Sequence, residues 1–414
     1  MKIRVFANKI MAAAAVSLLL LVAAACEEHE QQSGKLCLTL VMPSGYEDYD
    51  ISKVEISAKN VNTGRVVMLG MSRQDGDWCV VMDEGLYDVT VSAVMRDGDT
   101  DELSAIGYKE AVYLKSSGTR LSIDMVVQEK DKGGWVIAEI FFTGTVTPQG
   151  KQYNGDKYFR IFNNSDSVMY ADGIILLEAD FLTVSKRNYT PDIMSEAFTV
   201  QALYRVPGDG TTYPVQPGHS ILIVDNALDH RSANPNSFDL TKADFEWYDV
   251  STRPSVLDVE NPEVTNLEKI YCYTLTIWVP HNRGFSSYAI GRIPDGISPE
   301  QYLKDYYYDY EYDLVTTAGD FHMSGSGYKF PNEWILDAVN LSVEASFEWI
   351  VTDPSLDRGW THVGSIDHDK SRYGKAVRRK YNGVGANGRL KLKDTNNSTE
   401  DFDAEVPADP YYLP

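Results

Sequence analysis

Asp225, Asp229 and His230 form one group of side chains that could carry chemistry. They follow a strand-like run and combine two carboxylates with an imidazole. Carboxylate oxygens and imidazole nitrogens are ligands of divalent metal ions, so the group is a candidate metal site. Asp and Asn after a strand are also ordinary loop residues, and a turn without a metal is the alternative.

A second group lies in residues 305–313, where tyrosines alternate with carboxylates. Exposed rings could stack on sugar faces while the acids accept hydroxyl hydrogens, which would make a glycan-binding patch. The alternative is a strand at a sheet edge, with tyrosines facing inward and acids facing outward. The candidate ligand-binding residues are Tyr306, Tyr308, Tyr310, Asp309 and Asp313.

The only cofactor that the sequence suggests is a divalent cation such as calcium. Asp97, Asp99 and Asp101 stand at alternate positions, as ligands do in calcium loops. An EF-hand loop requires Gly at its sixth position and Glu at its twelfth, where this chain has Glu102 and Tyr108. An acidic hairpin loop is therefore the preferred interpretation, and we expect no cofactor.

Known catalytic motifs do not occur in the chain. It contains no G-x-S-x-G, no H-E-x-x-H and no P-loop. With 60 Asp and Glu residues, pairs of acids carry no information about a glycosidase site. We therefore expect no enzyme activity and name no catalytic residue.

Composition favours an all-β protein of two domains. The chain has 414 residues, more than one hydrophobic core usually organises. Its 26 Tyr against 14 Phe suit sheet surfaces better than helical bundles. The net charge of -22 opposes binding to nucleic acid and to anionic membrane surfaces.

The first 25 residues have the pattern of a signal peptide: a basic start, an apolar centre and small residues before Cys26. The ending Ala24-Ala25-Cys26 resembles the lipobox of bacterial lipoproteins, in which the cysteine is acylated with palmitate-type chains. This resemblance implies an outer-membrane protein held by lipid on Cys26, since several acyl chains anchor stably. An ordinary cleaved signal is the alternative.

Residues 26–34 form an acidic tether. Glu27, Glu28 and Glu30 resemble the surface-export signal of Bacteroidota lipoproteins, which implies a position on the outer face of the outer membrane. A solvated tether facing the periplasm is the alternative.

Residues 35–130 predict a first β-sandwich. Short runs rich in β-branched and aromatic residues alternate with turn signals, at the size of an immunoglobulin-like or prealbumin-like module. Cys37 and Cys79 lie within it, either joined as a disulfide or buried as free thiols.

Residues 134–414 predict a larger second domain. Residues 135–142, WVIAEIFF, and 156–166, DKYFRIFNNSD, resemble the opening of lamin-tail-like domains, with Arg160 where the pattern usually has Glu. Residues 394–402, DTNNSTEDF, resemble their end. Together with the residues between, this part resembles the Bacteroidota lipoprotein family of unknown function DUF4876. The resemblance implies an immunoglobulin-like sandwich with long insertions and a few short helices, whose first strands pair with its last.

These features lead to one functional hypothesis and two alternatives. We expect a non-catalytic, surface-exposed outer-membrane lipoprotein that presents a binding domain. The resemblance implies an accessory of a TonB-dependent transporter. The alternatives are an adhesin or glycan-binding protein, and a metal-dependent hydrolase. Because the ends of the second domain have the pattern of scaffold strands, we place the function between residues 190 and 369.

Overall fold

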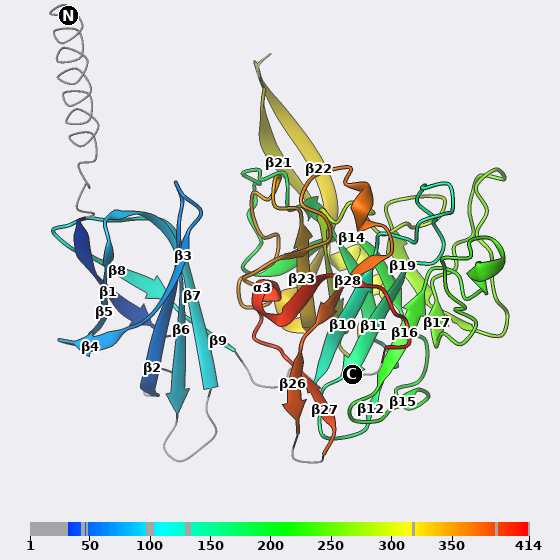
Figure 1. Ribbon diagram of the computed structural model, residues 1–414, viewed down its shortest axis with the longest axis horizontal. Helices are drawn as coiled ribbons and strands as arrows, with labels where there is room; N and C mark the ends of the chain where they lie inside the picture. Colours follow the sequence, from blue (N-terminus) through cyan, green and yellow to red (C-terminus); the bar gives the residue numbers. More distant parts are fainter. Residues whose placement is uncertain are drawn as a thin grey trace, which may run out of the picture. The chain divides into compact units, whose positions relative to one another are not determined.

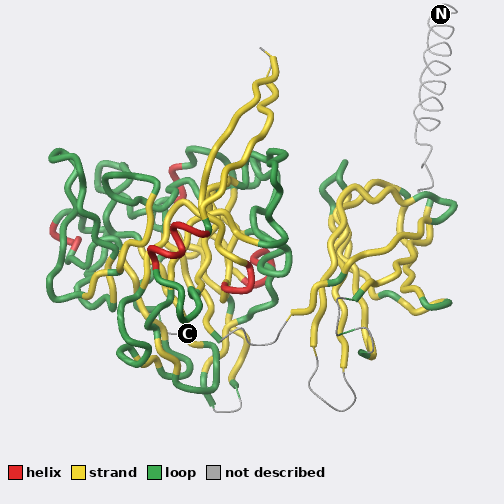
Figure 2. The backbone as a smooth tube through the Cα atoms, turned by 180° about the vertical axis from the view of Figure 1, so that it is seen from behind, coloured by secondary structure: helices red, strands yellow, loops and turns green. Residues whose placement is uncertain are grey.

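The computed structural model describes residues 32–42, 46, 49–96, 103–128, 134–316, 319–385 and 388–412. These residues form two compact units, the first extending to Val127 and the second beginning at Gln128. Most of the structure is strand, which confirms the predicted all-β class (Figures 1 and 2). No described helix is long and apolar enough to cross a membrane.

The first unit is built from two sheets. One has the strand order β4-β5-β1-β8 and the other β3-β2-β6-β7-β9. Side chains from both sheets, such as Leu38, Ile56 and Val89, share one buried core, so the sheets pack as a sandwich. The strands are β1 (Ser33–Val41), β2 (Asp50–Asn60), β3 (Val66–Gly70), β4 (Ser72–Gln74), β5 (Asp77–Asp83), β6 (Gly85–Arg96), β7 (Leu103–Leu114), β8 (Thr119–Asp124) and β9 (Val126–Gln128).

Cys37 and Cys79 are joined by a disulfide. The two residues lie directly opposite each other on the antiparallel strands β1 and β5, with Cα atoms 4.1 Å apart. Of the two alternatives left open by the sequence, the structure has the cross-link.

The second unit contains a seven-stranded sheet with the order β18-β17-β16-β11-β10-β25-β28. Its strands are β10 (Trp135–Phe141), β11 (Tyr158–Asn163), β16 (Ser220–Val224), β17 (Phe245–Glu246), β18 (Thr265–Asn266), β25 (Lys375–Arg379) and β28 (Phe402–Pro407).

An eight-stranded sheet has the order β21-β22-β14-β13-β20-β23-β24, with a further strand, β19, paired to β14. Its strands are β13 (Ile175–Leu182), β14 (Ala197–Arg205), β19 (Glu268–Cys272), β20 (Ser286–Gly291), β21 (Tyr307–Thr316), β22 (Gly319–Pro331), β23 (Ile335–Ser342) and β24 (Thr361–His362). Two small pairs complete the unit: β12 (Met169–Tyr170) with β15 (Pro214–Val215), and β26 (Tyr381–Val384) with β27 (Leu390–Leu392).

The central strands of both large sheets are buried on both faces. Between them lies a core in which Phe159 of β11 and Tyr288 of β20 meet with ring centroids 5.0 Å apart. A second cluster, including Phe198 and Phe330, covers the outer face of the eight-stranded sheet, and a third, including Phe141 and Leu222, covers the seven-stranded sheet. This double burial explains why residues 135–141 are hydrophobic without alternation.

The few helices are short. Helix α2 (Pro299–Asp305) begins after its cap Ser298, whose side chain accepts a hydrogen bond from the N–H of Gln301. Helix α3 (Ser398–Asp401) precedes β28, and short 3-10 turns occur at His230–Ser232, Asn332–Trp334 and Lys370–Arg372.

The first strand of the second unit pairs with one near its end, as the sequence predicted. In the register of β10 and β25, Glu139 lies opposite Arg378 and Ile140 opposite Val377. The pairing of β10 with β25 thus closes a loop of chain that supplies most strands of both sheets. The lamin-tail resemblance itself stays a prediction.

Two segments differ from what their composition suggests. Residues 271–279 are strand-like in composition, but β19 ends at Cys272 and irregular chain follows. Residues 190–200 have the composition of a short helix or turn, and a turn does occur at 194–196, but Ala197 begins strand β14. In both segments pairing with neighbouring strands decides the outcome, and local composition does not show it.

Candidate functional site

The tyrosine–acid stretch forms β21, an edge strand paired antiparallel with β22 in a hairpin (Figure 1). Side chains alternate across the strand. Tyr308, Tyr310 and Tyr312 therefore occupy one face of the hairpin, and Asp309, Glu311 and Asp313 the other. The structure has the sheet edge that the sequence left as the alternative.

Tyr310 is directed into the protein and is only 9% exposed. Its hydroxyl donates to Asp180 Oδ2 at 3.0 Å, and its ring packs edge-on against Phe181 and Tyr189. The opposite residue is Gly325, where a Cβ would lie 2.6 Å from the Tyr310 ring. The ring fills the space that glycine leaves, and its faces are not available to a sugar.

The other predicted tyrosines are also engaged. The Tyr308 hydroxyl lies 2.6 Å from Thr199 Oγ1, and the Tyr306 ring packs 4.9 Å from that of Trp334. The rings of Tyr306, Tyr308 and Tyr310 therefore anchor the base of the hairpin, as the sheet-edge interpretation predicts, and do not form an exposed platform for a glycan.

The predicted acids Asp309 and Asp313 lie on the exposed face of the hairpin. Asp313 Oδ1 lies 3.0 Å from His322 Nδ1, and Glu311 Oε2 lies 3.3 Å from His322 Nε2. The hydrogen bond between His322 and the Asp313 carboxylate and the charge of Glu311 raise the pKa of His322. This face is a negatively charged strip with one histidine in it.

The three predicted metal ligands do not converge. Asp229 is held by Arg231, whose Nε and Nη2 each lie 2.7 Å from its oxygens. His230 uses both ring nitrogens, one 3.0 Å from the Tyr153 hydroxyl and the other 2.9 Å from the Asn226 carbonyl. Within the described ranges, no three His, Cys, Asp or Glu side chains gather where they could hold a metal ion. Asp229 and His230 therefore have structural partners, as the loop interpretation predicts, and are not gathered with Asp225 as metal ligands.

A buried carboxylate that the sequence did not reveal lies on β13. Glu178 accepts hydrogen bonds from Trp278 Nε1 at 2.7 Å, the Tyr288 hydroxyl at 2.8 Å and the N–H of His281 at 3.1 Å. Burial raises the pKa of Glu178, and these donors oppose the rise. The donors bind the irregular segment after β19 to the centre of the eight-stranded sheet.

Lys157 and Asp225 form a second buried polar pair, at the ends of the neighbouring strands β11 and β16. The N–H of Asp225 donates to the Lys157 carbonyl at 2.9 Å, so the two residues lie next to each other on neighbouring chain segments. Lys157 is fully buried, and its Nζ has no hydrogen-bond partner among the described residues. Burial lowers the pKa of Lys157 to about 8 and raises the pKa of Asp225 to about 7, and the attraction between the two charges opposes both shifts.

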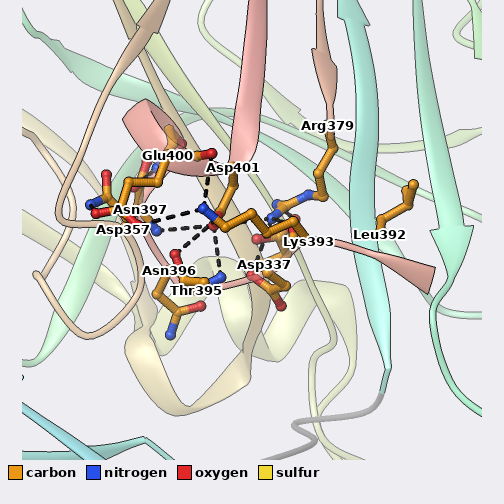
Figure 3. A network of polar contacts seen from close by, with 12 residues as sticks. Asp337, Asp357, Arg379, Leu392, Lys393, Thr395, Asn396, Asn397, Glu400 and Asp401 are labelled. Carbon is orange, nitrogen blue, oxygen red and sulfur yellow. Dashed lines mark hydrogen bonds and ion pairs between the residues drawn. The ribbon is translucent and has the colours of Figure 1, made fainter. Parts of the chain in front are cut away.

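The closing motif DTNNSTEDF is the centre of a polar network (Figure 3). Arg379 at the end of β25 pairs with Asp337 of β23, and its Nη1 lies 3.1 Å from Asp394 Oδ1 and 3.6 Å from Asp401 Oδ2. Asp401 accepts hydrogen bonds from the N–H and hydroxyl of Thr395 at 2.7 and 2.8 Å. The network joins the two large sheets, since β25 and β23 belong to different ones.

Asp357 and Asn397 extend this network to the chain before β24. Asp357 accepts from the N–H groups of Ser398, Asn340 and Gly359. Asn397 caps α3 by accepting from the N–H of Thr399. Each polar group of the motif therefore has a structural partner.

Residues 216–409 match the model of the family DUF4876, which is described as a protein of unknown function. The predicted family is confirmed for this segment.

A solved structure of a DUF4876 family protein from Bacteroides thetaiotaomicron VPI-5482 has 20% sequence identity to this chain and a TM-score of 0.55. The match covers 91% of this chain and 96% of that one, and it shows a shared fold. A second structure, a "Putative cell adhesion protein" from Parabacteroides distasonis ATCC 8503, has 11% identity over 75% of this chain and 96% of that one. Its TM-score of 0.16 supports no argument. No protein with a curated description matches the chain.

The DUF4876 segment also contains a surface that the sequence did not reveal. Two loops carry large apolar side chains that are each more than half exposed: Val250, Leu257, Val259, Tyr273 and Leu275. The loops are joined, because the N–H and hydroxyl of Thr252 donate to the Leu275 carbonyl at 3.0 and 2.8 Å. Asp258 closes the first loop by accepting from the N–H of Asp249 at 2.8 Å. We call these five side chains the loop patch.

Some predicted residues cannot be placed. Cys26, Glu27, Glu28 and Glu30 lie outside the described residues, as does the acidic loop at 97–102. Their roles stay predictions.

Replacing Arg379 with Met should lower the free energy of unfolding of the second unit by about 3–5 kcal/mol, because Asp337 would remain buried without its counter-charge. Urea unfolding followed by tryptophan fluorescence measures this loss. The exposed Lys242, changed to Met, serves as the control. Adding Asp337→Asn to Arg379→Met should restore part of the stability; a loss no larger than that of Lys242→Met would contradict the role of the network.

Lys157 and Asp225 should produce a minimum in stability between about pH 7 and 8. The folded protein keeps the Asp225 proton up to about pH 7, whereas the unfolded carboxyl loses it near 3.8, so stability falls as the pH rises between these values. Folded Lys157 loses its proton near pH 8 and the unfolded amine near 10.5, so stability rises again over that range.

The control for this minimum is the double variant Lys157→Met with Asp225→Asn. The difference in unfolding free energy between wild type and variant, measured in urea from pH 5 to 10, should be least favourable to the wild type near pH 7 to 8. A difference that does not change with pH would show that the pair does not titrate as stated.

Proposed function

We propose that this protein is a non-catalytic binding protein, held by lipid on Cys26 at the outer face of the outer membrane. The loop patch is the observation that carries the proposal. Contiguous exposed apolar side chains are uncommon on monomeric surfaces and are typical of binding sites. Side chains such as Val250 and Leu275, about three-quarters exposed, would lose water contact when a partner covers them.

The buried polar groups support a structural rather than a catalytic role for the interior. Glu178 accepts hydrogen bonds from the segment after β19 and from β20, and Arg379 pairs with Asp337 of β23 and with Asp394 of the closing motif. Catalytic groups need an open path to substrate, whereas these groups are used to fix loops and strands.

A protein partner fits the loop patch better than a glycan. Val, Leu and Tyr side chains dominate it, and sugar sites need several polar groups that point toward the ligand. An outer-membrane TonB-dependent transporter is the specific partner that we propose, because a lipid anchor would keep the two proteins in one membrane.

The proposed position on the cell surface can be tested with proteinase K on intact cells. We expect the protein to be digested without lysis, and the Cys26→Ser variant to leave the membrane fraction because it lacks the acylated sulfur. Full protection of the wild type until lysis would place it in the periplasm and contradict the surface position.

The loop patch can be tested by exchanging Leu257 and Leu275 for Ser. Because both side chains are already exposed, we expect an unchanged melting temperature and about a tenfold or greater loss of a transporter recovered with the purified protein. Val66 and Met68, exposed on β3 of the first unit, provide the matched control when changed to Ser. Recovery of no transporter by the wild type, or equal loss in both variants, would contradict the proposal.

A further inference from the structure

The distal part of the β21–β22 hairpin has two chemically different faces. We define the distal ribbon as residues 311–314 of β21 and 321–324 of β22. Tyr312 lies opposite Met323, and Leu314 opposite Phe321, so these four side chains share one face. On the other face Glu311 lies opposite Ser324 and Asp313 opposite His322. The ribbon is apolar on one side and mainly acidic on the other.

Near the base of the hairpin this face is covered by the protein, whereas on the distal ribbon it is more exposed. Tyr310 at the base is almost fully buried, whereas Phe321 is 49% and Met323 38% exposed. Figures 1 and 2 show that the hairpin extends beyond the rest of the second unit, from opposite directions of view. Phe321 and Met323 are therefore presented where another molecule can contact them, whereas Tyr312 also packs against Tyr189 with ring centroids 5.3 Å apart.

The acidic side chains continue along this face toward both ends of the distal ribbon. Asp309 precedes Glu311 and Asp313 on it, and Asp320 follows the turn on β22. His322 between Glu311 and Asp313 neutralises part of this charge when protonated. Exposed carboxylates at this density attract a positively charged surface and repel a negative one.

The hairpin is fixed in position at its base. Tyr310 is bonded to Asp180, Tyr308 to Thr199, and β22 pairs with β14 from Pro331 to Tyr328. A rigid element loses little conformational entropy when it binds, so its exposed part is prepared for an interaction.

We propose that the distal ribbon inserts into a groove of a partner protein that has one apolar wall and one wall rich in Lys and Arg. A bilayer surface with anionic lipids would repel the acidic face. A second copy of this chain, with a net charge of -22, is an unfavourable source of a basic wall. This site is separate from the loop patch, so it goes beyond the function proposed above.

The test uses the full-length protein in its own membrane and probes the two faces separately. A photo-crosslinking residue, p-benzoylphenylalanine, replaces Phe321 to probe the apolar face. In the wild type, a water-soluble carbodiimide couples carboxylates to lysines in direct contact and so probes the acidic face. Cross-linked peptides are identified by mass spectrometry.

We expect both probes to reach one and the same protein, with apolar residues joined to position 321 and lysines joined to Glu311 or Asp313. Changing Glu311 to Gln and Asp313 to Asn should reduce the yield at position 321 about tenfold, since the basic wall contributes to binding. The matched control changes the exposed acids Glu263 and Glu333 to Gln, and should leave the yield unchanged.

Three outcomes would overturn the proposal. They are cross-links from position 321 to lipid or to another copy of this chain, cross-links from the two faces to different proteins, and no cross-link from either face. Because these substitutions lie on an exposed ribbon, an unchanged melting temperature of each variant separates loss of binding from loss of folding. Failure of the loop patch variants would leave this result unaffected.

Discussion

The pairing of β10 with β25 is the interaction on which the second unit depends. It joins residues separated by 239 positions, and Glu139 lies buried at the junction, where Arg378 Nε is 2.7 Å away. Closing a loop of this length costs on the order of 5 kcal/mol in chain entropy before the constant term. Burial of the strands and the ionic contacts of Arg378 and Arg379 offset that cost. The closing motif is thus part of the core, and Figure 3 shows the hydrogen bonds and ion pairs among its polar side chains.

Closure has a consequence for where a function can lie. Since the central strands of both large sheets are covered on both faces, these strands offer no surface for a ligand. Exposed chemistry is left to the loops at 250–259 and 273–275 and to the distal part of the β21–β22 hairpin at the edge of its sheet. Both lie inside the segment that matches DUF4876, and both lie within the range 190–369 where the sequence placed the function.

The sequence revealed the frame of the fold better than its sites. Strands such as 135–141 and 158–163 are hydrophobic enough to be recognised alone, and the closing motif pointed to their partner. The tyrosine stretch was ambiguous because alternation fixes two faces without telling which one is buried. Asp180 and Gly325 decide that question; Asp180 lies 130 positions from Tyr310, and Gly325 faces Tyr310 only through the register of the hairpin. Lys157 and Asp225 were separately visible, but only the register of β11 with β16 brings them together.

The register of β21 with β22 makes the distal ribbon unusual for a strand pair that only supports the fold. An edge strand with exposed apolar side chains is a template for unwanted pairing, and proteins commonly protect such edges with charge. Here the charges stand on the face opposite Phe321 and Met323, so they guard against stacking on one side only. The pairs Tyr312 with Met323 and Leu314 with Phe321 contribute to the hairpin only as cross-strand contacts, typically less than about 1 kcal/mol each. Their exposed position at the end of a rigid hairpin is better accounted for by contact with another molecule than by any requirement of the sheet to which they belong.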